Sequence, residues 1–248
     1  MTFPTLNDIT YSEEEAGNTT SQSVTVCDNC ANLDLLIIVG SIDASQGGVV
    51  TWDNTTAGTW IEYYLSNGSA GTVWATCHAK ISDGTESLAV LGITTELERS
   101  VFYSFRVPAA EWFGGDGIGA LVDGFFANLD TTPTGTGTDV NPPNLDPSVG
   151  AEDFTWIAVA HADLSALQTI SVFSEASDQN QSSNTDNGAA LVAISSRELN
   201  ASSYDPATDY TMTAADQRMG ATLGIRPAAP AGGPVLMPAS FSQSMVRF

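Results

Sequence analysis

Two short apolar stretches dominate the hydrophobic pattern of the chain. The first, Asn32–Ile42, contains five consecutive large aliphatic residues, Leu35–Val39, and the second runs from Phe154 to Asp163. Neither is long enough to cross a bilayer, and the β-branched residues of the first favour a strand that is buried on both faces over a helix. We expect the two stretches to be the central strands of a sandwich.

Shorter β-prone runs fill much of the remaining chain, separated by clusters of Gly, Asn, Asp, Ser and Thr. Residues 59–65 and 72–81 flank a loop that contains Asn67-Gly68, which is typical of a β-hairpin. Apolar and polar residues alternate over Ser100–Val107, whereas residues 118–127 fit either a strand or a short helical turn. About ten to twelve candidate strands predict an all-β protein, and their spacing predicts a jelly-roll-like antiparallel β-sandwich.

Proline, glycine and polar clusters divide the chain into a body and two ends. Residues 1–22 are polar and are expected to form an N-terminal arm or lead-in strand, and residues 228–248 a Pro/Gly-rich C-terminal arm. We expect residues 23–227 to be a single sandwich domain in which residues 131–150 make a long crossover between the sheets and residues 178–187 make a polar loop. No convincing repeat of about 20–50 residues is present, and the two aliphatic stretches fit a weak two-fold pseudo-repeat and two unrelated core strands equally well.

The charge balance argues against several classes of partner. The chain carries 29 acidic residues against 7 basic ones, for a formal net charge of -22 at pH 7. Such a surface repels phosphate backbones, so we expect no nucleic-acid partner. No window of about 18 apolar residues is present, and the N-terminal residues lack the basic and apolar regions of a secretory signal. We therefore expect a protein that is made in the cytoplasm and does not enter a membrane.

The three cysteines offer one candidate metal site. Cys27 and Cys30 have the C-x-x-C spacing of zinc ligands, and Cys77 with His78 could complete a set of four. However, neighbouring residues on a strand point to opposite faces of a sheet, so the latter two side chains would diverge. We therefore expect Cys27 and Cys30 to form a local disulfide or to remain thiols, and we expect no metal and no other cofactor.

Few residues are candidates for acid–base chemistry. His161 and Asp163 would share one face of a strand, which could orient an imidazole for base catalysis, but no Gly-x-Ser-x-Gly nucleophile motif accompanies them. Carboxylate pairs are expected anywhere in so acidic a chain, and the oxygen-rich loop after residue 138 has no EF-hand pattern. These pairs and loop residues are Glu152 with Asp153, Asp83 with Glu86, and Asp139, Asn141, Asn144 and Asp146. We expect structural roles for them and no enzymatic activity.

A series of short motifs runs through residues 20–227. It comprises Leu33–Val39, Thr51-Trp52, Lys80–Glu86, Asn141–Pro147 with Trp156–Val159, Arg197–Ser203 with Asp205-Pro206, and Ile225–Pro227. In this order and spacing the series resembles a group of tailed-phage structural proteins that are common in marine phage and prophage genomes. The resemblance implies a β-sandwich virion component of the minor structural, tail or decoration type, and it brings no catalytic residues.

The resemblance and the predicted architecture together suggest a function. We expect a non-enzymatic virion protein, in the first place a capsid decoration or cement protein that binds major capsid subunits through its two arms. We expect it to form homo-oligomers, with trimers favoured. The arm residues that we expect to contact the partner are apolar: Phe3, Leu6, Val235, Leu236, Met237, Phe241 and Phe248.

An alternative hypothesis is a tail or baseplate adhesin that binds glycans of the host surface. Trp112 and Phe113 lie in the Gly-rich segment Glu111–Gly119 and could stack against sugar rings. A glycoside hydrolase on a sandwich fold is a third hypothesis, and it would need two carboxylates at catalytic separation across a cleft.

Overall fold

The computed structural model describes residues 2–14, 19–26, 29–44, 50–53, 60–66, 73–86, 88–115, 118–130, 137–164, 170–171, 179–184, 189–206 and 210–229, to which all structural statements refer. Within these ranges the regular structure is almost entirely β, with a single short helix, α1 (Ile118–Gly124). The all-β prediction is therefore confirmed.

The N-terminal half of the chain forms the first sheet. Its strand order is β1-β7-β3-β6-β5, and neighbouring strands are antiparallel. The five strands are β1 (Asn7–Glu14), β3 (Asn32–Ala44), β5 (Ile61–Ser66), β6 (Val73–Asp83) and β7 (Leu88–Val107). Two more, β2 (Thr19–Thr25) and β4 (Val50–Asp53), pair with the first part of β7. The first apolar stretch is therefore a central strand, as predicted, and β5 with β6 is the predicted hairpin.

The C-terminal half forms the second sheet, which has the order β12-β13-β10-β15-β8. Its strands are β8 (Phe125–Asp130), β10 (Glu152–Leu164), β12 (Gln179–Asn184), β13 (Ala189–Ala201) and β15 (Arg218–Ile225). A small third sheet is made of β9 (Gly137–Val140), β11 (Ile170–Ser171) and β14 (Tyr210–Asp216). The second apolar stretch is thus the central strand β10, as predicted, whereas the expected polar loop at residues 178–187 contains the edge strand β12.

The five strands β1, β3, β5, β6 and β7 of the seven-stranded first sheet have the same topology as the five strands of the second sheet. Numbered by their order along the chain, these five strands are arranged 1-5-2-4-3 in each sheet. The central strands β3 and β10 are each 13 residues long, and they begin 120 residues apart, at Asn32 and Glu152. At equivalent positions, Leu35 of β3 pairs with Ile81 of β6, and Thr155 of β10 pairs with Glu198 of β13. The molecule is therefore built from two copies of one sheet topology.

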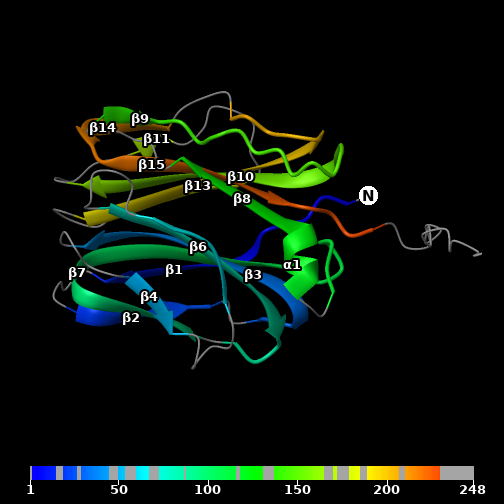
Figure 1. Ribbon diagram of the computed structural model, residues 1–248, viewed down its shortest axis with the longest axis horizontal. Helices are drawn as coiled ribbons and strands as arrows, with labels where there is room; N and C mark the ends of the chain where they lie inside the picture. Colours follow the sequence, from blue (N-terminus) through cyan, green and yellow to red (C-terminus); the bar gives the residue numbers. More distant parts are fainter. Residues whose placement is uncertain are drawn as a thin grey trace, which may run out of the picture.

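The two sheets pack face to face around a shared apolar core (Figure 1). Alternate residues of each central strand point into it, among them Leu35, Ile37 and Val39 from β3 and Ile157 and Val159 from β10. This arrangement is the predicted sandwich. Because the apolar run of β3 continues through both sets of alternate positions, the strand needs an apolar environment on its other face as well.

Each sheet has its own covering layer on the outer face. The outer side chains of the first sheet, including Leu36 and Ile38, pack beneath Val24, Val26 and Trp60. The second sheet is covered over one region by Val140 of β9 and over another by Leu145 and Tyr204. Figure 1 shows the resulting stack, with β9 and β14 at one side and β2 and β4 at the other. Both faces of both sheets are therefore closed over the described core residues.

Three details differ from the sequence-based expectations. The jelly-roll topology is not confirmed, because each sheet is drawn from one continuous half of the chain instead of from interleaved halves. The connection between the sheets runs through residues 108–124, after β7 and before β8, and residues 131–150 join two strands of the second sheet. Finally, the expected N-terminal arm is not separate from the sandwich, because β1 and β2 both pair with β7.

Candidate functional site

The apolar residues proposed to contact a partner fall in different environments. Leu6 is only 5% exposed and belongs to the core that the two sheets share, so it cannot serve as a free anchor. Phe3 is half-buried. The five C-terminal candidates, Val235, Leu236, Met237, Phe241 and Phe248, lie outside the described residues, which end at Ala229.

Trp112 and Phe113 do not form an exposed sugar-stacking pair. Trp112 is 1% exposed, its indole Nε1 donates to the Leu33 carbonyl at 3.1 Å, and its backbone bridges to Pro227. Phe113 is half-buried, with the Arg226 guanidinium 4.0 Å above the centre of its ring. Both aromatic rings therefore stabilise the segment between the two sheets, and the indole of Trp112 offers no free face to a ligand.

The three candidate zinc ligands that the structure describes, Cys30, Cys77 and His78, do not converge. Cys30 is disulfide-bonded, Cys77 is a free and fully buried thiol in the shared core, and Cys27 lies outside the described residues. His78 is on the outer face of the first sheet, where its Nδ1 is 2.9 Å from the Thr76 hydroxyl. Burial lowers the pKa of His78 to about 3 and raises that of Cys77 far above its ordinary value. Among the described residues no group of three metal-ligating side chains converges.

His161 lies at the centre of a buried polar network between the sheets. Its Nδ1 is 3.1 Å from Ser41 Oγ, and its Nε2 is 3.0 Å from the Tyr64 hydroxyl. Ser41 in turn donates to the Leu191 carbonyl at 2.6 Å. The imidazole is 0% exposed, so no substrate can reach it, and the side chain of its expected partner Asp163 lies outside the described residues. The arrangement fits a structural histidine.

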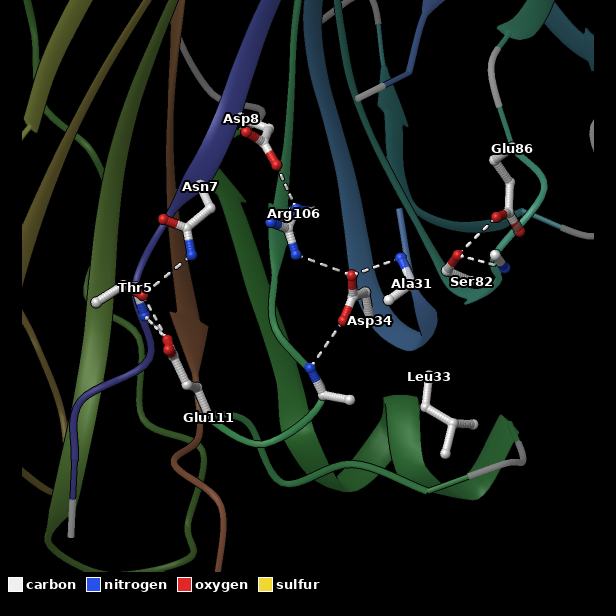
Figure 2. Close-up of polar contacts among 12 residues, drawn as sticks. Thr5, Asn7, Asp8, Ala31, Leu33, Asp34, Ser82, Glu86, Arg106 and Glu111 are labelled. Carbon is white, nitrogen blue, oxygen red and sulfur yellow. Dashed lines mark hydrogen bonds and ion pairs between the residues drawn. The ribbon is translucent and has the colours of Figure 1, made fainter. Parts of the chain in front are cut away.

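A cluster of ion pairs and hydrogen bonds holds the N-terminal strand at one end of the first sheet (Figure 2). The Asp34 carboxylate, 3% exposed, accepts hydrogen bonds from Ala31 N at 2.8 Å and Ala109 N at 2.9 Å, and it pairs with Arg106 at 3.0 Å. Arg106 also pairs with Asp8 of β1. Asp34 thus joins the entry to β3, the exit from β7 and, through Arg106, the first strand.

Glu111 makes a second set of contacts beside this cluster. Its carboxylate accepts from the backbone N of Thr5 at 2.9 Å and from the Thr5 hydroxyl, and its carbonyl accepts from Ala228 N at 2.9 Å (Figure 2 shows the Thr5 contacts). A single residue of the connection between the sheets therefore holds both the N-terminal and the C-terminal segments. Neither Asp34 nor Glu111 was singled out from the sequence. The only signal for Asp34 is an acidic residue inside an otherwise apolar strand.

The remaining basic residues are likewise engaged within the molecule. Lys80 pairs at 2.8 Å with Glu86, whose side chain is 2% exposed. Burial alone would raise the pKa of Glu86, but hydrogen bonds from Lys80, Ser82 and the backbone outweigh it and lower the value to about 2. Arg226 makes two hydrogen bonds of 2.6 Å to Glu152. Every lysine and arginine in the described part of the chain has an interaction partner.

Among the described residues of the oxygen-rich loop, no three acidic side chains converge. Asp139 lines a cleft of about 130 Å³ with Asp130, Asn141 and Arg218, and the Arg218 guanidinium donates to the Asp139 carbonyl. Further along, Asp146 accepts from Ser148 N at 2.8 Å in a local turn. The carboxylates of the other sequence pairs are used internally, since Glu152 binds Arg226 and Asp153 accepts from Asn200. These carboxylates therefore bind other groups of the protein.

The sequence matches no family model, no curated protein and no solved structure. Within the described ranges, no helix has the length and apolar character needed to span a membrane.

Proposed function

We propose that the chain is a non-enzymatic structural component of a tailed-phage virion, and specifically a capsid decoration protein that binds major capsid subunits through its C-terminal segment. The observation that carries the proposal is that, in the described part of the chain, other residues cover the core faces of both sheets. Both sheets are covered on both faces, and His78, Cys77 and His161 are all buried. A body of this kind offers a rigid platform, so contacts with a partner fall to the chain ends and loops.

The C-terminal segment differs chemically from the body. Residues 228–248 contain no Asp or Glu in a chain that has 29 acidic residues, and they include the apolar residues Val235, Leu236, Met237, Phe241 and Phe248. A peptide of this composition gains free energy by burying side chains in an apolar groove of a partner, and it does not carry the repulsive charge of the body. The composition therefore supports its use as an attachment peptide.

The residues that lead into this segment, from Arg226 to Ala228, are held on the body by several contacts. Arg226 pairs with Glu152 through two hydrogen bonds and stacks on Phe113, and Ala228 N donates to the Glu111 carbonyl. Tension on the segment would be transmitted to the second sheet through β15, which ends at Ile225. A decoration protein must resist such forces. Of the two N-terminal candidates, by contrast, Leu6 lies in the shared core and Phe3 is half-buried.

The proposal is tested by measuring the protein on particles. Purified virions that carry the gene should contain hundreds of copies per particle when the protein is compared with the major capsid protein by quantitative mass spectrometry. Absence from the particles would contradict the proposal as a whole, and a handful of copies would contradict the capsid location.

The role of the C-terminal segment is tested separately. Replacement of Val235, Leu236 and Met237 by serine should abolish binding of the purified protein to undecorated particles while leaving its thermal unfolding unchanged. Phe3→Ser, which alters the other chain end, is the matched control and should bind normally. Normal binding by the triple variant would exclude the segment as the attachment peptide.

A further inference from the structure

The core that the two sheets share is mostly apolar, and a hydrogen-bonded group around His161 lies within it. His161 comes from β10 in the second sheet, and both of its ring nitrogens contact the first sheet, at Ser41 of β3 and Tyr64 of β5. The third bond of the network, from Ser41 to the Leu191 carbonyl, also crosses between the sheets. Ser41 and His161 occupy equivalent positions, 120 residues apart, in the two central strands. The network is therefore a set of polar contacts, here called the tie, that joins the two sheets through their central strands.

The hydrogen bonds define the protonation state of the ring. Ser41 has one proton and donates it to Leu191, so Nδ1 of His161 must carry a hydrogen to bond with Ser41. Nε2 is then free to accept the hydrogen of the Tyr64 hydroxyl. In this arrangement a neutral imidazole satisfies all three groups. A second proton, on Nε2, would leave the Tyr64 hydrogen without its acceptor and would place a full positive charge in the core.

No carboxylate among the described core residues is placed to neutralise that charge; the hydrogen bond between the ring and the Gly40 backbone favours the charged form, but burial outweighs it. The titratable side chains that the facing strands contribute to this core are Tyr63 and Tyr64 of β5, Cys77 of β6 and Tyr103 of β7, all of which are neutral at acid pH. Arg99 of β7 lies two residues before Val101 on the same face, and as a cation it cannot neutralise the charge. On its own sheet His161 is flanked by Val192 of β13 and Met219 of β15. Burial accordingly lowers the pKa of His161 to about 3. An unpaired charge in an apolar core is unfavourable until the core admits water.

The outer cores do not depend on this tie. The first sheet packs against Val24, Val26 and Trp60, and the second sheet packs against Leu145 and Tyr204. Each sheet with its own cover is therefore a layered unit that retains apolar packing on one face when the shared core opens.

We propose that His161 is an acid-sensitive tie between the two halves of the molecule, and that uptake of a proton by its imidazole opens the shared core while each sheet and its outer core persist. The proposal concerns a conformational response of the fold and does not depend on the function proposed above.

The chain contains a suitable reporter for this opening. Cys77 is a free thiol, is 0% exposed and lies in the shared core, so it reacts with a reagent only when that core opens. We suggest measuring its rate of labelling by 4,4′-dithiodipyridine from pH 7.5 to pH 4.5, relative to glutathione at each pH. If His161 has an ordinary pKa in the open state, proton linkage predicts that the labelling rate rises about 100-fold from pH 7.5 to pH 4.5. Below pH 6 the rise is about tenfold per pH unit. Cys77→Ala should remove the signal.

Two histidine variants separate the tie from general acid effects. His161→Gln keeps a neutral hydrogen-bonding side chain, and its labelling rate should change less than about threefold with pH, because no imidazole titrates. His78→Gln, on the outer face of the first sheet, should retain the full rise. If the labelling rate rises equally in His161→Gln and in the wild type, the proposal is wrong. It is also wrong if the labelling rate of the wild type does not change with pH, and this result can be interpreted without any variant.

Hydrogen exchange distinguishes opening of the shared core from global unfolding. Amides in the β3–β6 and β10–β13 ladders should stay protected at pH 4.5 while Cys77 reacts, because those ladders lie within single sheets. Loss of ladder protection in parallel with labelling would show that the whole protein unfolds, and the proposed partial opening would then be wrong.

Discussion

The two halves of the molecule share a strand order but close their outer faces by different chemistry. In the first half, buried polar and charged residues lie among the apolar ones, including Thr76, His78 and Lys80 on β6 and Asp34 on β3. In the second half, the outer face around Trp156 is lined by stacked aromatic rings. The comparison teaches that the topology requires a central apolar strand with two strands on each side of it, whereas the outer face of the sheet can include buried polar residues or be lined by aromatic rings.

The largest expected effect tests the aromatic cover of the second half. Trp156 is fully buried, stacks on Phe154 with ring centres 4.7 Å apart, and lies 5.7 Å from the ring of Tyr204. Trp156→Ala should lower the free energy of unfolding by about 3–5 kcal/mol, since it leaves a cavity beneath the cover. Urea denaturation measures the change, and Trp156→Phe, which keeps a stacking ring, should lose less than half as much. A loss below about 1 kcal/mol in the alanine variant would show that the aromatic cover is dispensable.

The corresponding test in the first half removes the buried carboxylate. Asp34→Ala leaves Arg106 without its inner partner and two backbone N–H groups without acceptors. We expect a loss of about 3 kcal/mol in the free energy of unfolding, measured in the same way. Asp34→Asn keeps an oxygen acceptor and should recover part of the loss. If the two variants are equally destabilised, the charge matters more than the hydrogen bonds.

The pH dependence of stability also distinguishes the two halves, because His78 is one of the buried polar residues on the outer face of the first sheet. Its pKa in the folded protein, about 3, lies below the ordinary value of 6.5, so the unfolded chain binds more protons between these values. Stability contributed by neutral His78 is therefore complete above pH 6.5 and is lost as the pH falls, by about 2 kcal/mol at pH 5. His78→Gln should reduce the difference in unfolding free energy between pH 7.5 and pH 5 by that amount, and an unchanged difference would argue against it.

The smallest effect concerns the ion pair at the root of the C-terminal segment. The Glu152 and Arg226 side chains are 19% and 20% exposed, so solvent screens their charges more than it screens those of Asp34. Glu152→Gln should cost about 1–2 kcal/mol, less than Asp34→Ala. Added salt should reduce the difference in unfolding free energy between the wild type and Glu152→Gln. A larger loss than in Asp34→Ala would reverse the ranking of the two halves.

Much of the fold could be read from the pattern of apolar residues. Asn32–Ile42 and Phe154–Asp163 predicted the two central strands because a short run that is apolar at successive positions needs cover on both faces. The hairpin around Asn67-Gly68 followed from turn chemistry. The same two stretches fitted a two-fold pseudo-repeat and two unrelated core strands equally well. The sequence could not decide between these, because strand order depends on long-range pairing and the equivalent residues Leu36 and Trp156 share only their apolar character.

The sites were harder to predict for a related reason. Trp112 lies in a Gly-rich segment that resembles a surface loop, but that segment is the connection between the sheets, and its indole fills space beneath the crossing chain. Leu6 was assigned to an arm because the residues around it are polar, although a single leucine at the entry to β1 is sufficient to anchor the strand in the core. In both cases the local composition was read correctly and the tertiary neighbours decided the role.

Every lysine and arginine in the described part of the chain interacts with another group of the protein, and this has a practical consequence. Lys80, Arg99, Arg106, Arg197 and Arg218 all lie within strands, and Arg226 directly follows β15. A protease such as trypsin must draw several residues around a lysine or arginine into its cleft in an extended and unpaired form. Each of these sites would have to leave a hydrogen-bonded ladder or break an ion pair first. The described body is therefore a poor substrate for trypsin-like enzymes.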